Sequence, residues 1–440
     1  RLLNCNTRIA MDNIGNKIGL ALSGGGYRAA AYHVGTLRAL RYLGLLDKVD
    51  VISSVSGGSI VAAYYLLHKD NFRLFLKDFN KKIHIGVMHL AYTNVFLFVS
   101  AFIAIGYVFG WAWSLLIIPV FWFLNFKLMP LSIWIRKQYD WHFFHGKTLS
   151  DLPDVPRAII NTTDVALASP FKFSKDRAWG FAYRDYRTGT DSFTGVNFPI
   201  SLAVMASSCV PFAFNPIRMP EKFRKNKVSK LPLLVDGGLY DNQGVHEISE
   251  QTSEHYFTKY AIVSNAGNTE LDDKKIWNIV KLLIKTSDIL MKRIEKLQSR
   301  KIMFSSSNVE SRFASLSLTW DATDRLVRSF VWNIAQGLVP AEVYQEHGIE
   351  EGEAEAMRKH HQISKGYKSD DLERLMQKVK NSIGWDSLEH LRPNEEEVEI
   401  ARDVCTGLDG LSKKKIYCLQ KFSEWMTIVQ VRMYLPNLLN

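Results

Sequence analysis

The chemistry that this sequence suggests centres on one serine, Ser56. It follows the stretch 51–55, which reads as a strand, and precedes Gly57 and Gly58. A serine between a buried strand and a helix that opens on small residues is expected at a sharp turn that exposes its hydroxyl. This is the pattern of the G-x-S-x-G nucleophile elbow, although Ser54 stands in place of the first glycine. Ser56 is therefore a candidate nucleophile for acyl transfer.

A glycine-rich turn could supply the electrostatic partner for such a nucleophile. The apolar stretch 18–22 runs into Gly24, Gly25 and Gly26, and a helical pattern follows. Glycines let the backbone approach a ligand closely, and N–H groups at the start of a helix can stabilise the oxyanion of acyl transfer. The spacing fits neither of the nucleotide-binding glycine motifs. A phosphate-binding turn or a plain tight turn is the alternative.

A base is suggested by Asp236, which ends the apolar stretch 233–235 and precedes Gly237 and Gly238. Alone, such a segment is more often a turn than a catalytic site. A serine nucleophile needs a base within hydrogen-bond reach, and an aspartate at the end of a strand beside the elbow strand can provide it. Burial, or cover by lipid, would raise the pKa of this carboxyl from its usual value of about 3.9.

In this order, the three segments resemble the signature of the patatin-like phospholipase family. The glycine turn with Arg28 matches G-G-G-x-[RK], Ser56 and Gly58 match the elbow, and Asp236 begins a match to D-G-[GA]. Ser54 is the one departure. The resemblance covers about residues 15–265, includes weaker similarity at 157–164 and 203–216, and has a faint echo at 406–422.

The resemblance implies a serine–aspartate dyad. Asp236 would take the proton of Ser56 as it attacks an ester carbonyl, and water or another alcohol would remove the acyl group from the serine. Gly24, Gly25 and Gly26 would form the oxyanion hole, with Gly58, Gly237 and Gly238 in supporting positions. Arg28 either holds the glycine turn, which we favour, or pairs with a lipid phosphate. His246 is the best candidate for a third member, although a surface or helix-start role is favoured for it.

The pattern of elements predicts an α/β fold. Five predicted strands, at 18–22, 49–54, 157–162, 232–235 and 260–264, alternate with helices, which favours a mostly parallel sheet covered on both faces. The resemblance implies a three-layer α/β/α patatin-like fold. We expect one catalytic domain over residues 1–440, interrupted by a hydrophobic insertion at 86–134 and by a polar helical insertion of unknown role at 340–405.

Charge and composition narrow the expected partners. The net charge is +11, which favours acidic partners. No nucleic-acid motif is present, so an anionic phospholipid surface is preferred over nucleic acid. The four cysteines lack metal-ligand spacing and no calcium-loop pattern occurs, so we expect no metal and no cofactor. The oligomeric state is left open.

The stretch from Gly86 to Phe126 contains no Asp, Glu, Lys or Arg. A bilayer span needs about twenty apolar residues, so this length suits two transmembrane helices or a monotopic hairpin that enters one leaflet. A buried helical pair is the alternative. Basic residues on both flanks predict that both ends, and the catalytic domain, lie on the cytoplasmic side of a membrane.

These observations predict a membrane-associated lipid acyl hydrolase that cleaves carboxylic esters of phospholipids or lysophospholipids. The alternatives are an acyltransferase or a neutral glycerolipid lipase and, in another class, a catalytically silent membrane scaffold. The stretch 276–297 has an apolar stripe opposite basic residues. It predicts an amphipathic helix that either packs on the sheet or lies on the membrane.

Overall fold

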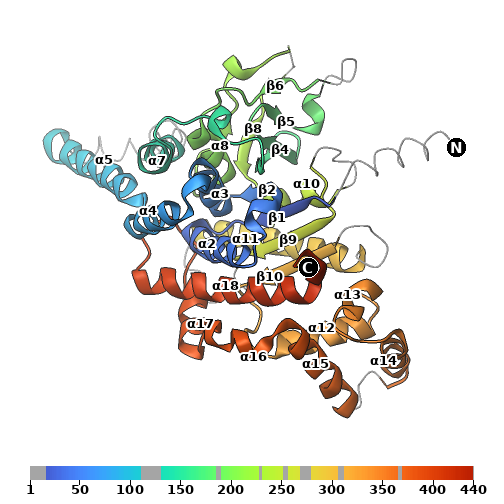
Figure 1. The fold of residues 1–440 in the computed structure, drawn as a ribbon. Helices are drawn as coiled ribbons and strands as arrows, with labels where there is room; N and C mark the ends of the chain where they lie inside the picture. The colour runs from blue at the N-terminus through green and yellow to red at the C-terminus, as the bar shows by residue number, and fades with distance from the viewer. Residues whose placement is uncertain are drawn as a thin grey trace.

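The structure is a computed structural model of the 440-residue chain. It describes residues 16–110, 130–184, 190–226, 230–250, 256–267, 279–305, 312–364 and 369–439. A large sheet lies at the centre, with helices on both of its faces and a group of C-terminal helices beyond one edge (Figure 1). Two apolar clusters, one on each face, form the core. The predicted three-layer α/β architecture is confirmed.

The central strands are parallel and the remaining strands antiparallel. The sheet runs in the order β10-β9-β1-β2-β3-β4-β5-β6, with β8 paired to β3 and β7 paired to β8. The strands are β1 (Ile18–Leu22), β2 (Val49–Val55), β3 (Arg157–Asp164), β4 (Ser169–Phe173), β5 (Arg177–Trp179), β6 (Phe193–Thr194), β7 (Ile217–Arg218), β8 (Leu233–Asp236), β9 (Tyr260–Asn265) and β10 (Arg312–Ser317). From β10 to β3 every pairing is parallel. These strands are almost continuously buried, as expected for a parallel sheet covered on both faces.

Strand β3 brings two distant strand ends together. Along one side of β3, Val55 at the end of β2 pairs opposite Asn161. Asp236, at the end of β8, pairs opposite Thr162, which is the next residue of β3, and β8 runs antiparallel to β3. Strand β4 occupies the other side of β3 over the same residues. β2 and β8 therefore meet end to end, which explains how Asp236 reaches the elbow although its strand does not pair with β2.

Helices follow β1 and β2 directly and cover the sheet. The helices are α2 (Gly26–Tyr42), α3 (Gly57–Leu67), α4 (Phe72–Ile85), α5 (Met88–Phe109), α7 (Leu131–Tyr139), α8 (Ile200–Ser207), α9 (Gly238–Asp241), α10 (His246–Ser249), α11 (Ile279–Ser305), α12 (Arg325–Ala335), α13 (Ala341–Gln345), α14 (Glu351–Ser364), α15 (Ser369–Ile383), α16 (Trp385–Leu388), α17 (Glu395–Arg402) and α18 (Lys413–Tyr434). Helices α13 to α17 make up most of the polar stretch 340–405.

The C-terminal helix α18 packs along α2 in the core. A Cβ at Gly35 of α2 would lie 2.1 Å from the carbonyl oxygen of Gln420, so only glycine permits this approach. Trp425 and Phe422 of α18 are fully buried. Residues near the end of the chain thus support the helix that follows the glycine turn.

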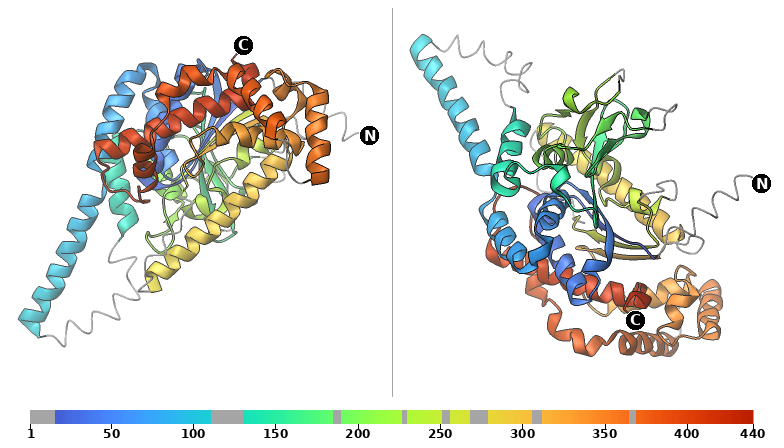
Figure 2. Two further views of the ribbon diagram at one scale, coloured as in Figure 1. Left: turned by 90° about the horizontal axis from the view of Figure 1, so that it is seen from below. Right: turned by 45° about the horizontal axis from the view of Figure 1, so that its top comes forward.

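The hydrophobic insertion begins with α5, which projects away from the body of the molecule (Figure 2). Among the residues that the structure describes, no helix is both long enough and apolar enough to cross a membrane. His89, Thr93 and Asn94 lie in the first turns of the 22-residue α5, and its uninterrupted apolar part falls short of the roughly twenty residues of a span. The predicted transmembrane helix is therefore not found, and 111–129 lie outside the described residues.

Candidate active site

Ser56 occupies a strained turn between β2 and α3. Its φ of 49° and ψ of −118° place a non-glycine residue in a region that side chains rarely adopt, as expected at a nucleophile elbow. The turn is packed closely against the end of β1. A Cβ on Gly57 would lie 2.0 Å from the carbonyl oxygen of Gly26, and one on Gly58 would lie 2.4 Å from that of Leu22. Both positions after the serine therefore require glycine.

Ser54, which replaces the first glycine of the motif, is accommodated inside the sheet. Its side chain is buried and its hydroxyl donates a hydrogen bond to the carbonyl oxygen of Ile159 at 3.1 Å. Because this bond runs from β2 to β3, the hydroxyl does not point toward Ser56. The departure from the motif leaves the turn itself intact.

The backbone of the elbow is anchored by Ser207, at the end of α8. The N–H of Ser56 donates to the Ser207 hydroxyl at 2.9 Å, and this hydroxyl donates to the carbonyl oxygen of Asn161 at 2.7 Å. Sequence reasoning did not identify this role. The signal was present in the small residues at 206–208, but its meaning depends on a contact with a residue 151 positions away.

We expect Ser207→Ala to lower hydrolytic activity and to destabilise the fold, because the N–H of Ser56 and the carbonyl oxygen of Asn161 both lose a buried partner. An unsatisfied buried group costs about 1–3 kcal/mol. Urea unfolding and ester hydrolysis measure the two effects. The matched control is Ser201→Ala, a buried serine near the other end of α8. Equal activities of the two variants would contradict the anchoring role.

Asp236 lies beside Ser56 and is almost fully buried. The Ser56 side chain is one of its hydrogen-bond partners. The N–H of Gly238 donates to its Oδ1 at 2.7 Å. Burial, with a smaller contribution from the nearby Asp288, raises the pKa of Asp236 to about 7, while the bonds from Gly238 and Ser56 oppose the shift. A carboxyl with this pKa can accept a proton near neutral pH.

The glycine turn lies against both groups. A Cβ on Gly24 would lie 3.3 Å from the Cβ of Ser56. The N–H of Gly24 donates to the carbonyl oxygen of Asn242 at 2.9 Å. Among the residues that the structure describes, the N–H groups of Gly25 and Gly26 have no acceptor. Gly24 thus holds the turn in place, and the other two N–H groups are available to a ligand.

A buried network fixes this turn from behind. The Nε2 of His33, on α2, bonds to the carbonyl oxygen of Ser23 at 2.9 Å, so this nitrogen carries the hydrogen. The Nδ1 lies 2.9 Å from the Ser264 hydroxyl. Burial lowers the pKa of His33 to about 4, which keeps the ring neutral. The residue therefore ties β1, α2 and β9 together directly before the glycines.

Arg28 is buried and is bonded to main-chain carbonyl groups. Its Nε donates to the carbonyl oxygen of Ala266 at 3.0 Å and its Nη1 to that of Val404 at 3.2 Å. Burial lowers its pKa to about 10. These contacts join the helix after the glycine turn to β9 and to the C-terminal region, as a residue that supports the turn would do.

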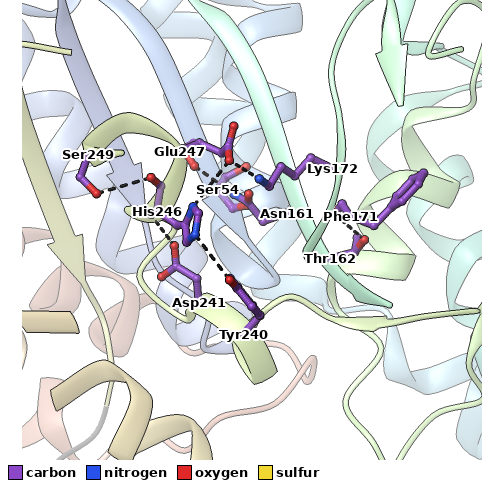
Figure 3. Close-up of polar contacts among 11 residues, drawn as sticks. Ser54, Asn161, Thr162, Phe171, Lys172, Tyr240, Asp241, His246, Glu247 and Ser249 are labelled. Carbon is purple, nitrogen blue, oxygen red and sulfur yellow. Dashed lines mark hydrogen bonds and ion pairs between the residues drawn. The ribbon is translucent and has the colours of Figure 1, made fainter. Parts of the chain in front are cut away.

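His246 does not join the Ser56–Asp236 pair. Figure 3 shows it beside Asp241 and Tyr240, with Glu247 next to it. Its Nε2 lies 3.5 Å from the Tyr240 hydroxyl and its Nδ1 3.6 Å from Glu247 Oε1. Its N–H donates to Asp241 at 2.7 Å. Asp241 also accepts the N–H groups of Gln243 and Gly244, so this cluster fixes the loop after Asp236.

Helix α11 lies over the site. The sulfur of Met291 would lie 3.0 Å from a Cβ on Gly238, next to Asp236. Glu295 accepts a hydrogen bond from Asn265 at 2.7 Å. The outward side of the helix carries exposed apolar residues, which are Ile279, Leu282, Leu283, Ile289, Leu290 and Leu297. One face of α11 thus packs against the site, while its outward face carries an exposed apolar stripe. Within the described parts of the chain, no group of His, Cys, Asp and Glu could hold a metal ion.

The chain is similar to several known proteins. A family model described as patatin-like phospholipase matches residues 20–248. A patatin-like phospholipase domain-containing protein of Caenorhabditis elegans, ZK370.4, is 49% identical over 59 residues, which are 13% of this chain and 4% of that protein. Human GIVD cytosolic phospholipase A2 has a TM-score of 0.46 and 10% identity, and the match covers all of this chain and 62% of that chain. VipD from Legionella pneumophila has a TM-score of 0.29 and 11% identity, over 94% and 92% of the two chains.

Proposed function

Because the chain belongs to the patatin-like phospholipase family, we propose that it is a membrane-associated lipid acyl hydrolase with Ser56 as nucleophile and Asp236 as base. The observation that carries the proposal is that the two side chains lie next to each other at a strained elbow, where the ends of β2 and β8 meet. The unpaired N–H groups of Gly25 and Gly26 beside them support it. The substrates are carboxylic esters of phospholipids or lysophospholipids.

In the proposed mechanism, the carboxylate of Asp236 takes the proton of the Ser56 hydroxyl as its oxygen attacks the ester carbonyl. The N–H groups of Gly25 and Gly26 stabilise the oxyanion of the tetrahedral intermediate, an effect worth about 10²–10³ in rate per donor in serine hydrolases. The alkoxide leaving group takes the proton from Asp236, which leaves an acyl group on Ser56. Water, activated by the same carboxylate, then releases the fatty acid.

Two helices support association with a membrane. α5 projects from the body of the protein, and its exposed apolar residues include Phe96, Leu97 and Ile103. The outward stripe of α11 lies over the site and is accompanied by Lys285, Lys296 and Arg293. Apolar side chains beside basic ones suit an anionic phospholipid surface. We propose that α5 enters one leaflet from the cytoplasmic side and that α11 rests on the lipid headgroups, so that esters reach Ser56 from the bilayer.

Product analysis tests the proposed reaction. Purified protein is incubated with vesicles that contain phospholipid, lysophospholipid and triacylglycerol, and the lipids are identified by mass spectrometry. We expect free fatty acid together with the deacylated phospholipid. Transfer of the acyl chain to an added alcohol without fatty acid release would favour an acyltransferase, and an unchanged lipid mixture would favour the silent scaffold.

We expect the double variant Phe96→Glu/Ile103→Glu to lose binding to anionic vesicles by about tenfold or more, because two charges on α5 oppose its entry into lipid. Hydrolysis of a soluble short-chain ester should be retained, since α5 makes no contact with Ser56 or Asp236. Vesicle co-sedimentation and ester turnover measure the two properties. The matched control, Tyr42→Glu/Tyr417→Glu, adds the same charge at exposed aromatic residues elsewhere. Equal loss of vesicle binding in both variants would contradict the role of α5.

A further inference from the structure

A second cavity lies at the edge of the sheet, away from Ser56. It has a volume of about 440 Å³, within the range of about 300–1,000 Å³ that ligand sites occupy. Strand β10 forms one wall, and α12, the start of α13 and the end of α18 form the others. β10 is the terminal strand of the sheet and is separated from β2 by β9 and β1. The cavity is therefore distinct from the elbow.

The walls of the cavity are mainly apolar. They include the side chains of Phe313, Trp320, Leu326, Leu338 and Val343. Trp320 is 40% exposed, whereas Val343 and Leu326 are buried, so the cavity leads from the surface toward the core. An apolar molecule, or an apolar chain, would bury its surface here.

Polar side chains also line the cavity, and two of the charged ones, Arg325 and Asp321, form an ion pair with each other. Gln430 lines it and is only 3% exposed, and its amide has no hydrogen-bond partner in the described parts of the chain. Buried amides in proteins are almost always paired, because an unpaired one loses its hydration without compensation. The guanidinium of Arg312 also lines the cavity and forms an ion pair with Glu342, which is 72% exposed. Since Arg312 has five N–H donors, this pair leaves several of them for a ligand.

We propose that this cavity is a binding site for a free fatty acid. The apolar walls would receive the acyl chain, and the carboxylate would accept hydrogen bonds from Arg312 and from the amide of Gln430. Arg325 is already paired with Asp321, and the guanidinium of Arg312, partly neutralised by the exposed Glu342, suits a single negative charge. A planar carboxylate can accept two parallel bonds from it. The inference goes beyond the proposed function and does not depend on it, because binding at this cavity requires no turnover at Ser56.

The test is a titration of the full-length Ser56→Ala protein with sodium laurate and with uncharged dodecanol, measured by isothermal calorimetry. We expect saturable binding that prefers laurate. Arg312→Gln should weaken laurate binding by about tenfold, the usual size of a charged hydrogen bond, and leave dodecanol binding unchanged. Ser329→Trp, at an exposed lining residue of α12, should weaken the binding of both ligands by blocking the cavity.

The controls separate ligand contacts from folding. Arg328→Trp adds the same ring at the neighbouring exposed residue, which does not line the cavity, and should bind laurate as the parent does. Gln430→Leu should weaken laurate binding while its melting temperature stays equal or rises, because the change removes an unpartnered buried amide. Absence of saturable binding, equal affinity for laurate and dodecanol, or laurate binding that survives both Arg312→Gln and Ser329→Trp would overturn the proposal.

Discussion

Ser56→Ala is expected to lower kcat for ester hydrolysis by about 10³-fold or more, because no other side chain can form the acyl intermediate. The fold should be retained. The hydroxyl is bonded to Asp236, but the anchoring bond from Ser56 to Ser207 uses the backbone N–H, which alanine keeps. A fluorophosphonate probe, which reacts with activated serines, should label the wild-type protein and not the variant.

The control for this experiment is Ser54→Ala, at the other serine of the elbow. Its hydroxyl donates to Ile159 within the sheet, so its loss should reduce stability modestly and leave the labelling intact. Labelling of Ser56→Ala at the wild-type level would show that another residue is the nucleophile. A wild-type protein that is never labelled would favour the silent scaffold.

Asp236→Asn is expected to reduce kcat/KM about as strongly as Ser56→Ala reduces kcat. The pH profile of the wild type should show that the carboxylate of Asp236 is needed as the base. Because the pKa of Asp236 is raised to about 7 by burial, the carboxylate needed as base is lost as the pH falls. Below about pH 7, kcat/KM should decrease tenfold per pH unit. A profile that is flat between pH 5 and 8 would exclude this carboxyl as the base.

The same variant, although less active, should be more stable than the wild type above neutral pH. A folded-state pKa of about 7 lies above the usual value of about 3.9, so folding favours the protonated form. The contribution of Asp236 to stability is full below the unfolded pKa and is lost as the pH rises through about 7. Asp236→Asn should therefore melt at a higher temperature than the wild type at pH 8, with a difference that shrinks toward pH 4.

A neighbouring carboxylate provides the control for this pair of measurements. Asp241 is also buried, but it accepts three backbone N–H groups and does not contact Ser56. Burial raises the pKa of Asp241 as well, so Asp241→Asn should show a similar pH dependence of stability, and it should keep the wild-type pH profile of kcat/KM. If Asp241→Asn lost both activity and its pH dependence, Asp241 rather than Asp236 would be the base.

Local sequence patterns predict much of this fold. The turns at Ser56 and at the glycines are specified by small residues next to apolar strands, so the motifs identify both the strands and the positions where they end. The central parallel strands follow from the same patterns. The strand β4 is not predicted, and neither are β5 to β7, which have only two or three residues each and are too short for an alternating pattern to be visible.

Long-range contacts could not be predicted from these patterns. Nothing around Asp236 indicates that its strand runs antiparallel to β3 and meets β2 end to end. The role of Ser207 likewise depends on its position beside the elbow. The stretch without charged residues after Gly86 predicts a membrane segment, but this criterion overlooks His89, Thr93 and Asn94, which shorten the apolar part of α5.

The pairing of β2 and β8 along β3 has a consequence for when activity arises during synthesis. The chain must extend 180 residues beyond Ser56 before Asp236 exists, as their positions in the sequence show. The carbonyl oxygen of Gly407, later still, accepts the N–H of Tyr27 directly after the glycine turn. A nascent or truncated chain that ends before these residues has the serine without its partners. In the proposed mechanism, a chain that ends before Asp236 therefore has no base for Ser56, and one that ends before Gly407 also lacks the contact that fixes the start of α2.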